Sequence, residues 1–243
     1  MTSKYRLLWA SLLLATLSLS AHAALPTTVD GKPVTSLAPL VEAVAPAVVS
    51  IRVTQERRNP FGMPAEASGG GSGVIVDAEN GYILTNHHVV GEADEIEVSL
   101  IDGRTFEAEV VGSDAATDIA LIKVEADELS EMPIGDSNDV HVGDFVIAIG
   151  SPYGLSHTVT SGIISSLGRT GIIRDGYEDF IHTDASINPG NYGGALVNMS
   201  GELIGICHLY TTQSPRDQLQ QRVCRLLLQK RAGGGGGRGG GGG

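Results

Sequence analysis

Cysteine is almost missing from this chain, and the two that occur stand toward its C-terminal end. Among 243 residues only Cys207 and Cys224 are cysteines, so residues 24–206 contain none. A domain built from that stretch cannot depend on disulfide bonds, even in a compartment that would permit them.

Positive charge is also scarce. Residues 24–206 hold eight Lys and Arg against 27 Asp and Glu, and the whole chain has a formal net charge of −12. This excess of acidic residues argues against nucleic acid or an anionic membrane as a partner. A solubilising surface is the simplest explanation of the acidity.

No apolar run is long enough to span a bilayer. The longest, residues 7–19, has 13 residues, whereas a spanning helix needs about 20. Lys4 and Arg6 precede this run and Ala-His-Ala follows it at 21–23, which is typical of a secretory signal peptide. We therefore predict that residues 1–23 are a signal peptide, that the mature chain makes no stable membrane insertion, and that its destination is the periplasm.

Glycine, in contrast, is abundant, with 33 residues, and it punctuates short alternating segments as in strands joined by tight turns. Residues 24–46 are predicted as an N-terminal segment with one short helix that ends before Pro46. Its apolar residues at helical spacing are Leu37, Leu40, Val41 and Val44.

Two sets of strand candidates follow, and they predict an all-β protein. The first set, within residues 47–144, comprises 47–53, 73–77, 82–86, 95–101, 105–111 and 118–124, which together could close one barrel. The second set, within residues 145–206, comprises 145–150, 158–167, 179–183 and a hairpin over 195–206. Residues 55–70 are polar and contain two prolines, so we predict a mobile loop there.

The most informative segment is the loop 188–196, Asn-Pro-Gly-Asn-Tyr-Gly-Gly-Ala-Leu. Glycines let backbone N–H groups come close to a reacting carbonyl, because no Cβ stands in the way. The nucleophile loop of a serine protease has such a frame, with a short hydroxyl side chain where Tyr192 stands here.

Two further segments supply partners for such a loop. Residues 85–90, Thr-Asn-His-His-Val-Val, follow an alternating strand and present His88. Residues 117–124, Thr-Asp-Ile-Ala-Leu-Ile-Lys-Val, open another strand with Asp118. The order His, Asp, nucleophile is that of chymotrypsin-like enzymes rather than of subtilisin or the α/β-hydrolases.

These motifs together resemble the protease domain of the HtrA/Deg family of periplasmic serine endopeptidases over residues 37–206. The resemblance rests on Gly-Ser-Gly-Val-Ile at 71–75, the His and Asp segments above, Ala-Ile-Gly-Ser-Pro-Tyr-Gly-Leu at 148–155 and Thr-Asp-Ala-Ser-Ile-Asn-Pro-Gly-Asn at 183–191. It implies a chymotrypsin/trypsin-like double β-barrel that needs no cofactor. It also implies unfolded polypeptides as substrates and a homotrimer built from N-terminal segments.

The same resemblance assigns a role to each site residue. His88 is the general base, Asp118 orients it, and Tyr192 occupies the nucleophile position. Gly190, Asn191 and Tyr192 form the oxyanion hole and substrate-binding loop, with the N–H groups of Gly190 and Tyr192 as the oxyanion donors.

Tyr192 is a poor substitute for serine. A phenol ionises only near pH ~10, and its oxygen lies too far from the backbone to meet both the substrate carbonyl and the oxyanion donors. Loss of a triad nucleophile costs on the order of a millionfold in turnover. Ser72 and Ser186 lie near the motifs but not at the nucleophile position, so we predict an inactive or strongly impaired chain.

Residues 207–243 depart from the preceding pattern. Alternation stops after Ile206, basic residues replace acidic ones, and residues 233–243 are glycine except for Arg238, which is typical of a flexible coil. The resemblance implies two closing strands and PDZ modules after Ile206, and neither is visible. We therefore expect a truncated second barrel and an aberrant, disordered tail; a genuine glycine-rich linker is the alternative.

No metal site is predicted. His87 and His88 are adjacent, which is not a zinc-ligand spacing. The remaining histidines of the mature chain show no paired Cys, His or Asp pattern; they are His141, His157, His182 and His208.

Three hypotheses about function remain open. The first is a serine endopeptidase of the HtrA type whose printed sequence carries errors at Tyr192 and near Cys207. The second is a pseudoprotease that binds unfolded peptides as a chaperone would, without cutting them. The third is the product of a frameshifted gene that folds poorly.

Overall fold

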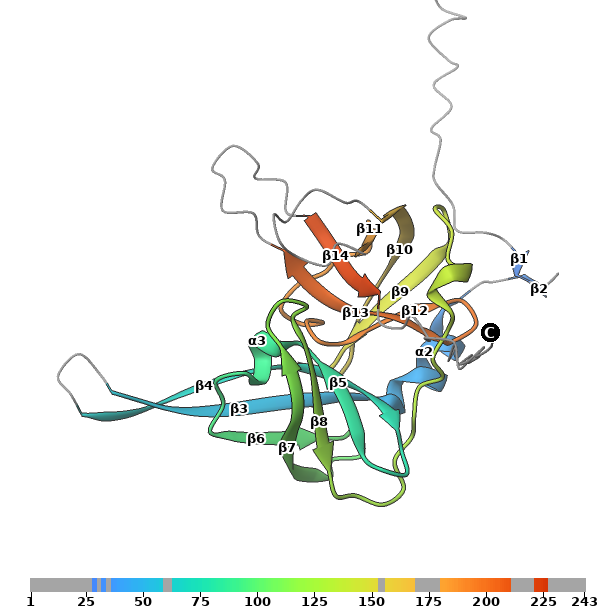
Figure 1. The fold of residues 1–243 in the computed structure, drawn as a ribbon. Coiled ribbons are helices and arrows are strands. Elements are labelled where there is room, and N and C mark those ends of the chain that lie inside the picture. Colours follow the sequence, from blue (N-terminus) through green and yellow to red (C-terminus); the bar gives the residue numbers. More distant parts are fainter. Residues whose placement is uncertain are drawn as a thin grey trace, which may run out of the picture. The chain divides into compact units, whose positions relative to one another are not determined.

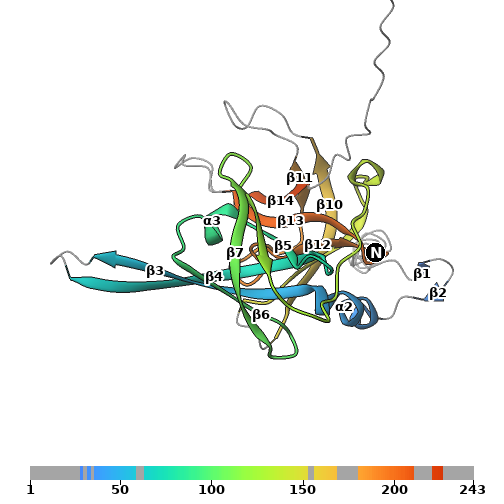
Figure 2. The ribbon, with the colours of Figure 1, turned by 60° about the horizontal axis from the view of Figure 1, so that its bottom comes forward.

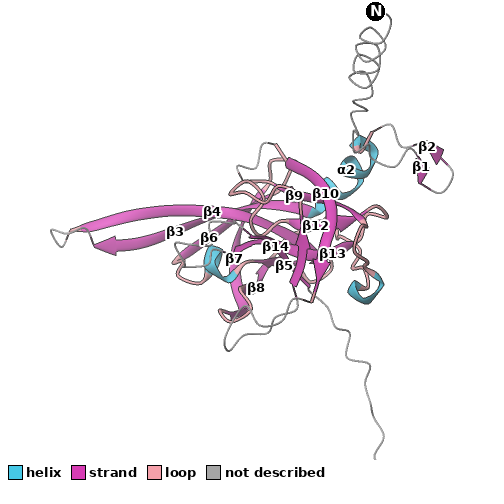
Figure 3. Cartoon of the chain, turned by 90° about the horizontal axis from the view of Figure 1, so that it is seen from above, coloured by secondary structure: helices cyan, strands magenta, loops and turns pink. Residues whose placement is uncertain are grey.

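Strands dominate the part of the chain that the structure describes (Figure 3). The structure is a computed structural model, and it describes residues 28–29, 32–33, 36–58, 63–152, 156–168, 180–210 and 221–226. The predicted signal peptide, residues 1–23, and most of the predicted tail lie outside the described residues. None of the helices within these ranges is both long and apolar enough to cross a membrane.

The N-terminal unit, Met1–Leu37, contains a two-stranded sheet. Its strands β1 (Thr28–Val29) and β2 (Lys32–Pro33) pair antiparallel. The second unit, Ala38–Gly243, opens with helix α2 (Ala38–Val44) and the 3-10 turn η1 (Ala45–Ala47). The predicted short helix is therefore confirmed, and it ends before Pro46 because proline has no N–H to continue the helical bonds.

Six strands close the first barrel in the order β3-β4-β5-β8-β7-β6 (Figure 1). Alternation builds its core: in β8 every second side chain is buried, and Ile83, Val98 and Ile122 are fully enclosed. The strands are β3 (Val48–Arg58), β4 (Pro64–Asp77), β5 (Tyr82–Thr85), β6 (Glu95–Ser99), β7 (Thr105–Asp114) and β8 (Ile119–Val124). All six were predicted, and helix α3 (His87–Val90) lies between β5 and β6.

The prediction of a mobile loop at residues 55–70 is wrong. There β3 and β4 continue as a two-stranded ribbon that extends beyond the barrel (Figures 1 and 2), paired from Thr54↔Ser68 to Arg58↔Pro64. Only residues 59–62 of this stretch lie outside the described residues. An exposed ribbon needs no apolar alternation, so its polar sequence resembles a loop, and a proline is tolerated as the first residue of a strand.

The second barrel closes in the order β10-β11-β14-β13-β12-β9. Its first strand comes after the 3-10 turn η2 (Ser137–Asp139). The strands are β9 (Phe145–Gly150), β10 (Thr158–Leu167), β11 (Phe180–Thr183), β12 (Ala195–Asn198), β13 (Leu203–Tyr210) and β14 (Gln221–Leu226). The bounds of β9 and β10 are those predicted, and the double β-barrel is confirmed.

The end of the second barrel differs from the prediction. Strand β13 continues past Ile206 to Tyr210, and β14 from the expected tail takes the sixth place in the barrel. Strand β14 pairs with β13 over six positions and with β11 over three. The expectation of a barrel truncated at residue 206 is therefore corrected. Without β14, the edges of β11 and β13 would leave backbone groups unpaired. An extended segment can pair with these groups even when its sequence lacks apolar alternation.

Candidate active site

The start of helix α3 is tied to the start of β8. Asn86, which precedes the helix, is buried, and its Nδ2 donates to the backbone oxygen of Asp118 at 3.1 Å. The backbone N–H of His87 donates to the same oxygen, also at 3.1 Å. These bonds bring the first turn of α3 over Asp118.

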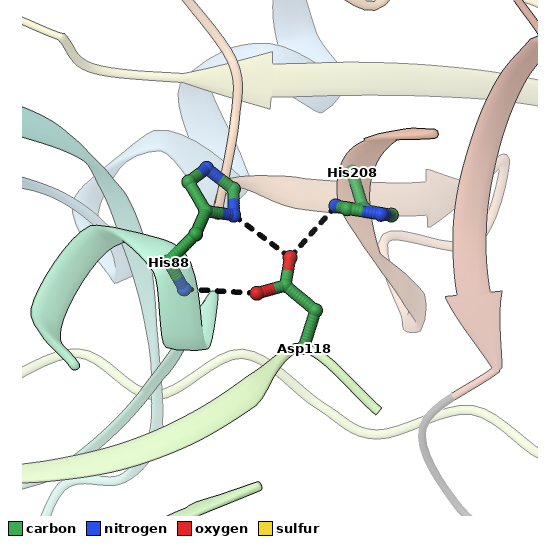
Figure 4. A group of neighbouring side chains, drawn as sticks. All are labelled: His88, Asp118 and His208. Atoms are coloured by element: carbon green, nitrogen blue, oxygen red, sulfur yellow. Dashed lines mark hydrogen bonds and ion pairs between the residues drawn. The ribbon is translucent and has the colours of Figure 1, made fainter. Parts of the chain in front are cut away.

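His88 is bound to Asp118 through both carboxylate oxygens (Figure 4). Its backbone N–H donates to Oδ1 at 2.8 Å, and its ring Nδ1 lies 2.8 Å from Oδ2. The neighbouring His87 points elsewhere, with its Nδ1 2.6 Å from Oγ of Ser113. A carboxylate on Nδ1 fixes the ring and favours Nε2 as the free, basic nitrogen, as a general base requires.

Asp118 itself is held in an unusual state. Its φ of 51° lies in the left-handed region, which few residues other than glycine adopt. Burial alone would raise the pKa of its carboxyl, but the imidazoles of His208 and His88 and the His88 backbone N–H outweigh burial and hold that pKa well below its usual range. The carboxylate is therefore charged at neutral pH.

The predicted nucleophile loop forms a compact turn around a buried asparagine. Asn191 is fully enclosed; its Oδ1 accepts the N–H of Asn188, and its Nδ2 donates to the backbone oxygen of Ser186 at 2.9 Å. Main-chain bonds attach the end of the loop to β13: the N–H of Gly193 donates to the oxygen of Cys207, and the N–H of Cys207 donates to the oxygen of Gly194, both at 2.9 Å.

Two glycines of the loop have no room for a side chain. Gly193 has a φ of +76°, and a Cβ there would lie 2.3 Å from the backbone oxygen of Ser72. A Cβ on Gly194 would lie 2.2 Å from the backbone oxygen of Ile149. The paired glycines that make the segment recognisable are thus required by close backbone approach.

Two of the three residues predicted for the oxyanion hole have their N–H groups engaged inside the loop. The N–H of Gly190 donates to Oδ1 of Asn188, and the N–H of Asn191 donates to the backbone oxygen of Asn188, both at 2.9 Å. For Gly190 to serve a substrate oxygen, its bond to the Asn188 side chain would have to be exchanged.

Tyr192 stands beside the His–Asp pair. Its ring centroid lies 6.2 Å from that of His88, with the planes 79° apart. Burial raises the pKa of the phenol above its ordinary value, so the hydroxyl is harder to ionise than in water. Among the described residues, no neighbouring group offsets this shift in the pKa of Tyr192.

The two other serines considered have structural roles. Ser72 is completely buried, and its Oγ accepts the N–H of Ser151 at 2.8 Å. The backbone oxygen of Ser186 accepts the side chain of Thr160 as well as that of Asn191. The side chain of Ser72 and the backbone of Ser186 therefore help to hold the loop at Tyr192.

His208 is the site residue that sequence reasoning missed. It lies on β13, and its Nδ1 is 2.7 Å from Oδ2 of Asp118, the oxygen that His88 also approaches (Figure 4). The sequence predicts that the strand pattern stops at Ile206, before this residue. Alternation from the buried Cys207 would have placed His208 on the opposite face of the strand.

Residues 71–206 match the family of trypsin-like peptidase domains. This range includes every residue of the candidate site described above except Cys207 and His208. The chain belongs to this family. Within it the chain is of the HtrA/Deg type, as the following relatives show.

Bacterial endoproteases are among the curated relatives of this trypsin-like peptidase chain. The periplasmic pH-dependent serine endoprotease DegQ of Escherichia coli (strain K12) is 48% identical over 207 residues, which cover 78% of this chain and 46% of DegQ. The periplasmic serine endoprotease DegP of the same strain is 46% identical over 211 residues, covering 70% and 44%. This chain therefore spans less than half the length of either relative.

Solved structures of HtrA-type proteases have the same fold. The HtrA-type protease AlgW with a decapeptide superposes with a TM-score of 0.67 at 39% identity, covering 79% of this chain and 64% of that chain. AlgW with a tripeptide gives a TM-score of 0.67 at 42% identity, covering 79% and 60%. Identity at this level makes the trypsin-like peptidase fold of this chain secure.

Proposed function

We propose that this chain is the peptidase domain of an HtrA/Deg-type serine endopeptidase for unfolded periplasmic polypeptides, and that Tyr192 impairs its catalysis. The observation that carries this proposal is the His88–Asp118 pair, bonded through Nδ1 and Oδ2 at 2.8 Å beside a glycine loop with Tyr192 at the expected position of the nucleophile. Serine endoproteases of this family are the relatives with the highest similarity reported above.

The roles of the residues follow from their chemistry. Asp118 holds the ring of His88 and stabilises its charged form when His88 accepts a proton. The N–H of Tyr192, and that of Gly190 once it has exchanged its bond to Oδ1 of Asn188, would bind the oxyanion of a tetrahedral intermediate. No metal or cofactor is needed for this acyl-transfer chemistry.

Tyr192 interrupts this sequence at its first step. Since burial raises the pKa of the phenol, His88 would have to remove a more tightly held proton than usual. The phenol oxygen also lies beyond the point that a serine Oγ would occupy, so attack and oxyanion binding cannot be satisfied together. We expect only the slow background hydrolysis that binding and an oxyanion hole supply without a nucleophile.

The substrate class and the compartment are supported by the relatives. DegQ and DegP are named as periplasmic, and AlgW was solved with a decapeptide and with a tripeptide. For this chain, a peptide substrate, a periplasmic location after signal cleavage and a homotrimeric assembly are parts of the proposal.

The deciding experiment compares the chain with Tyr192→Ser, using denatured casein and a fluorophosphonate probe. We expect the serine variant to hydrolyse casein at least about 1,000-fold faster, a conservative part of the roughly millionfold worth of a triad nucleophile. The double variant Tyr192→Ser/His88→Ala is the matched control and should lose the gain. Rapid, fluorophosphonate-sensitive hydrolysis by the unchanged chain would contradict the impairment.

Peptide binding without cleavage is the second candidate function. Residues Ser68, Gly69 and Gly70 of β4 pair with β3, whereas the pairing of β4 with β5 covers only residues 74–77. This strand lines a hollow of about 370 Å³ together with Pro152 and Pro189, next to the loop. An extended peptide could add to this side of β4 by backbone hydrogen bonds.

Fluorescence anisotropy with a labelled unfolded peptide separates the two candidates. If the second is right, the unchanged chain binds the peptide and leaves it intact over hours. Replacing Gly70 by proline removes a backbone N–H from this strand, and a Cβ there would also lie 2.5 Å from the backbone oxygen of Ile51. Both changes should weaken binding. Equal affinity in this variant would argue against the β4 edge as the binding surface.

A further inference from the structure

Three side chains of types that can bind a metal ion converge at the active site (Figure 4). His88 comes from α3, Asp118 immediately precedes β8, and His208 comes from β13. One ligand atom of each lies within 4.8 Å of the other two. Both imidazoles approach the same carboxylate oxygen, with Nδ1 of His88 at 2.8 Å and Nδ1 of His208 at 2.7 Å from Oδ2.

His208 is poorly accounted for by hydrogen bonding alone. Its side chain is 17% exposed, and its Nδ1 is buried without a hydrogen bond of acceptable direction, although Oδ2 of Asp118 is close. Buried polar atoms are normally satisfied, and one that is not needs an explanation. An ion between Nδ1 of His208 and Oδ2 of Asp118 would give this nitrogen a partner and hold the carboxylate at the same time.

We propose that His88, Asp118 and His208 form a binding site for a divalent metal ion of the zinc class. Two imidazole nitrogens and one carboxylate oxygen are the donor set of many three-ligand zinc sites, which keep a fourth position open. Zinc bonds to such donors are about 2.0–2.2 Å long, so small side-chain rotations suffice to open the 2.7–2.8 Å contacts around an ion. The negative charge of Asp118 offsets part of the charge of the ion.

This site goes beyond the proposed peptidase function and does not depend on it. An ion on Nδ1 of His88 takes the position of the bond that orients the imidazole for proton transfer. Metal binding and the peptidase arrangement of His88 therefore exclude each other, so in a Tyr192→Ser chain zinc would act as an inhibitor.

A second His–carboxylate pair serves as the internal control. Nδ1 of His141 lies 4.0 Å from Oδ2 of Asp144, and their side chains are 79% and 50% exposed. Within the described ranges no third ligand joins this pair, since the site above is the one group of three. His141→Ala thus removes a histidine near a carboxylate without touching the proposed site.

The test is calorimetric titration of the untagged chain with Zn²⁺, in parallel with His208→Ala and His141→Ala. We expect one ion per chain, and a loss of affinity in His208→Ala of at least the roughly 10- to 100-fold that removal of a mere outer-shell partner costs. His141→Ala should bind as the unchanged chain does. Equal affinity in His208→Ala, or no zinc binding by the unchanged chain, would overturn the site.

A measurement on the unchanged chain covers the case in which His208→Ala does not fold. Histidine ring signals in NMR spectra should shift on Zn²⁺ addition for His88 and His208 and stay in place for His141. Shifts confined to other histidines would overturn the proposal. Because binding is observed directly, neither result depends on whether the chain cleaves peptides.

Discussion

At the scale of single residues, Asp118 shows how local strain and charge combine at this site. Its left-handed backbone, with a φ of 51°, costs an L-residue other than glycine about 1–2 kcal/mol. The conformation lets one side chain accept the backbone N–H of His88 on Oδ1 while Oδ2 meets two imidazoles. The strain is therefore compensated by bonds to a charged group.

Asp118→Asn should reveal the worth of that charge. Asparagine tolerates the left-handed region about as well as aspartate, so the backbone is preserved, while the charge and one of the two acceptor oxygens are lost. Hydrogen bonds to charged groups contribute about 1.5–3 kcal/mol, and we expect a loss of that size in the free energy of unfolding at pH 7.

The difference in free energy of unfolding between the unchanged chain and Asp118→Asn should depend on pH. The folded pKa of Asp118 is lowered, so its contribution is fully present above the unfolded value of about 3.9 and is lost as the pH falls toward the folded value. Urea titrations should show the gap between the two proteins narrowing below about pH 4. A gap that is constant down to pH 2.5 would contradict the assigned pKa shift.

Gly193→Ala separates backbone strain from steric contact. Its φ is +76°, and its Cβ would meet the Ser72 oxygen at 2.3 Å, whereas Gly103 has a φ of +88° and open space around it. Gly103→Ala should cost about 1–2 kcal/mol for the left-handed conformation. Gly193→Ala should cost clearly more, or give no soluble protein, in the same urea measurement. Equal losses would mean that the loop relaxes away from Ser72 freely.

At the scale of elements, alternation of apolar and polar residues predicts the barrel strands. The polar sequence of the β3–β4 ribbon, in contrast, leads to the wrong prediction of a loop. Strands β9 and β10 have the predicted bounds, and five of the six residues of β9 are buried. The ribbon of β3 and β4 was missed because two paired strands in water need no apolar face. Strand β14 was missed because its place is set by backbone pairing with β13 and β11, which leaves no periodic signal.

The residues of the candidate site also fall into two groups, those that local sequence patterns predict and those that they do not. His88, Asp118 and the loop at Tyr192 lie in local segments whose residues fit one chemistry, so they could be predicted. His208 and the bond from Gly190 to Asn188 depend on tertiary contacts. No local pattern announces that a histidine on β13 reaches a carboxylate at the start of β8.

Strand β14 offers a prediction at this scale. Val223 pairs with His208 on one side and with His182 on the other. Val223→Pro removes its backbone N–H from the ladder, which should cost about 1–3 kcal/mol and expose the edges of β13 and β11 to aggregation. Thermal unfolding with light scattering is the measurement, and Val223→Ala, which keeps the N–H, is the control.

Unchanged melting and scattering in Val223→Pro would show that β14 does not help to close the barrel. It would also favour the hypothesis that the residues after Cys207 come from a frameshift. A clear loss in the proline variant alone would show that this segment is part of the fold.

At the scale of the whole two-barrel unit, Ser72 joins the halves. It lies on β4 of the first barrel, and its N–H donates to the oxygen of Tyr192 at 2.8 Å while its Oγ accepts the N–H of Ser151, both partners in the second-barrel half of the chain. Its own carbonyl accepts the hydroxyl of Thr85. Through this one residue, the segment leading to α3 and the loop at Tyr192 share a fixed point.

Ser72→Ala should loosen this connection. The buried N–H of Ser151 would lose its acceptor, at a cost of about 1–3 kcal/mol. Ser99→Ala is the matched control, because its Oγ meets Thr105 at 3.3 Å in an exposed pair, and such surface changes usually stay within about 0.5 kcal/mol. Equal unfolding midpoints for all three proteins would show that Ser72 is not a structural joint.

The loop at Tyr192 is fastened to β13 by main-chain bonds between Gly193, Gly194 and Cys207. Main-chain bonds do not depend on the side chain of Tyr192, so position 192 can change while the frame of the loop persists. A serine codon and a tyrosine codon differ by one base. A single base change could thus place a serine at position 192, so loss of the nucleophile would be evolutionarily reversible.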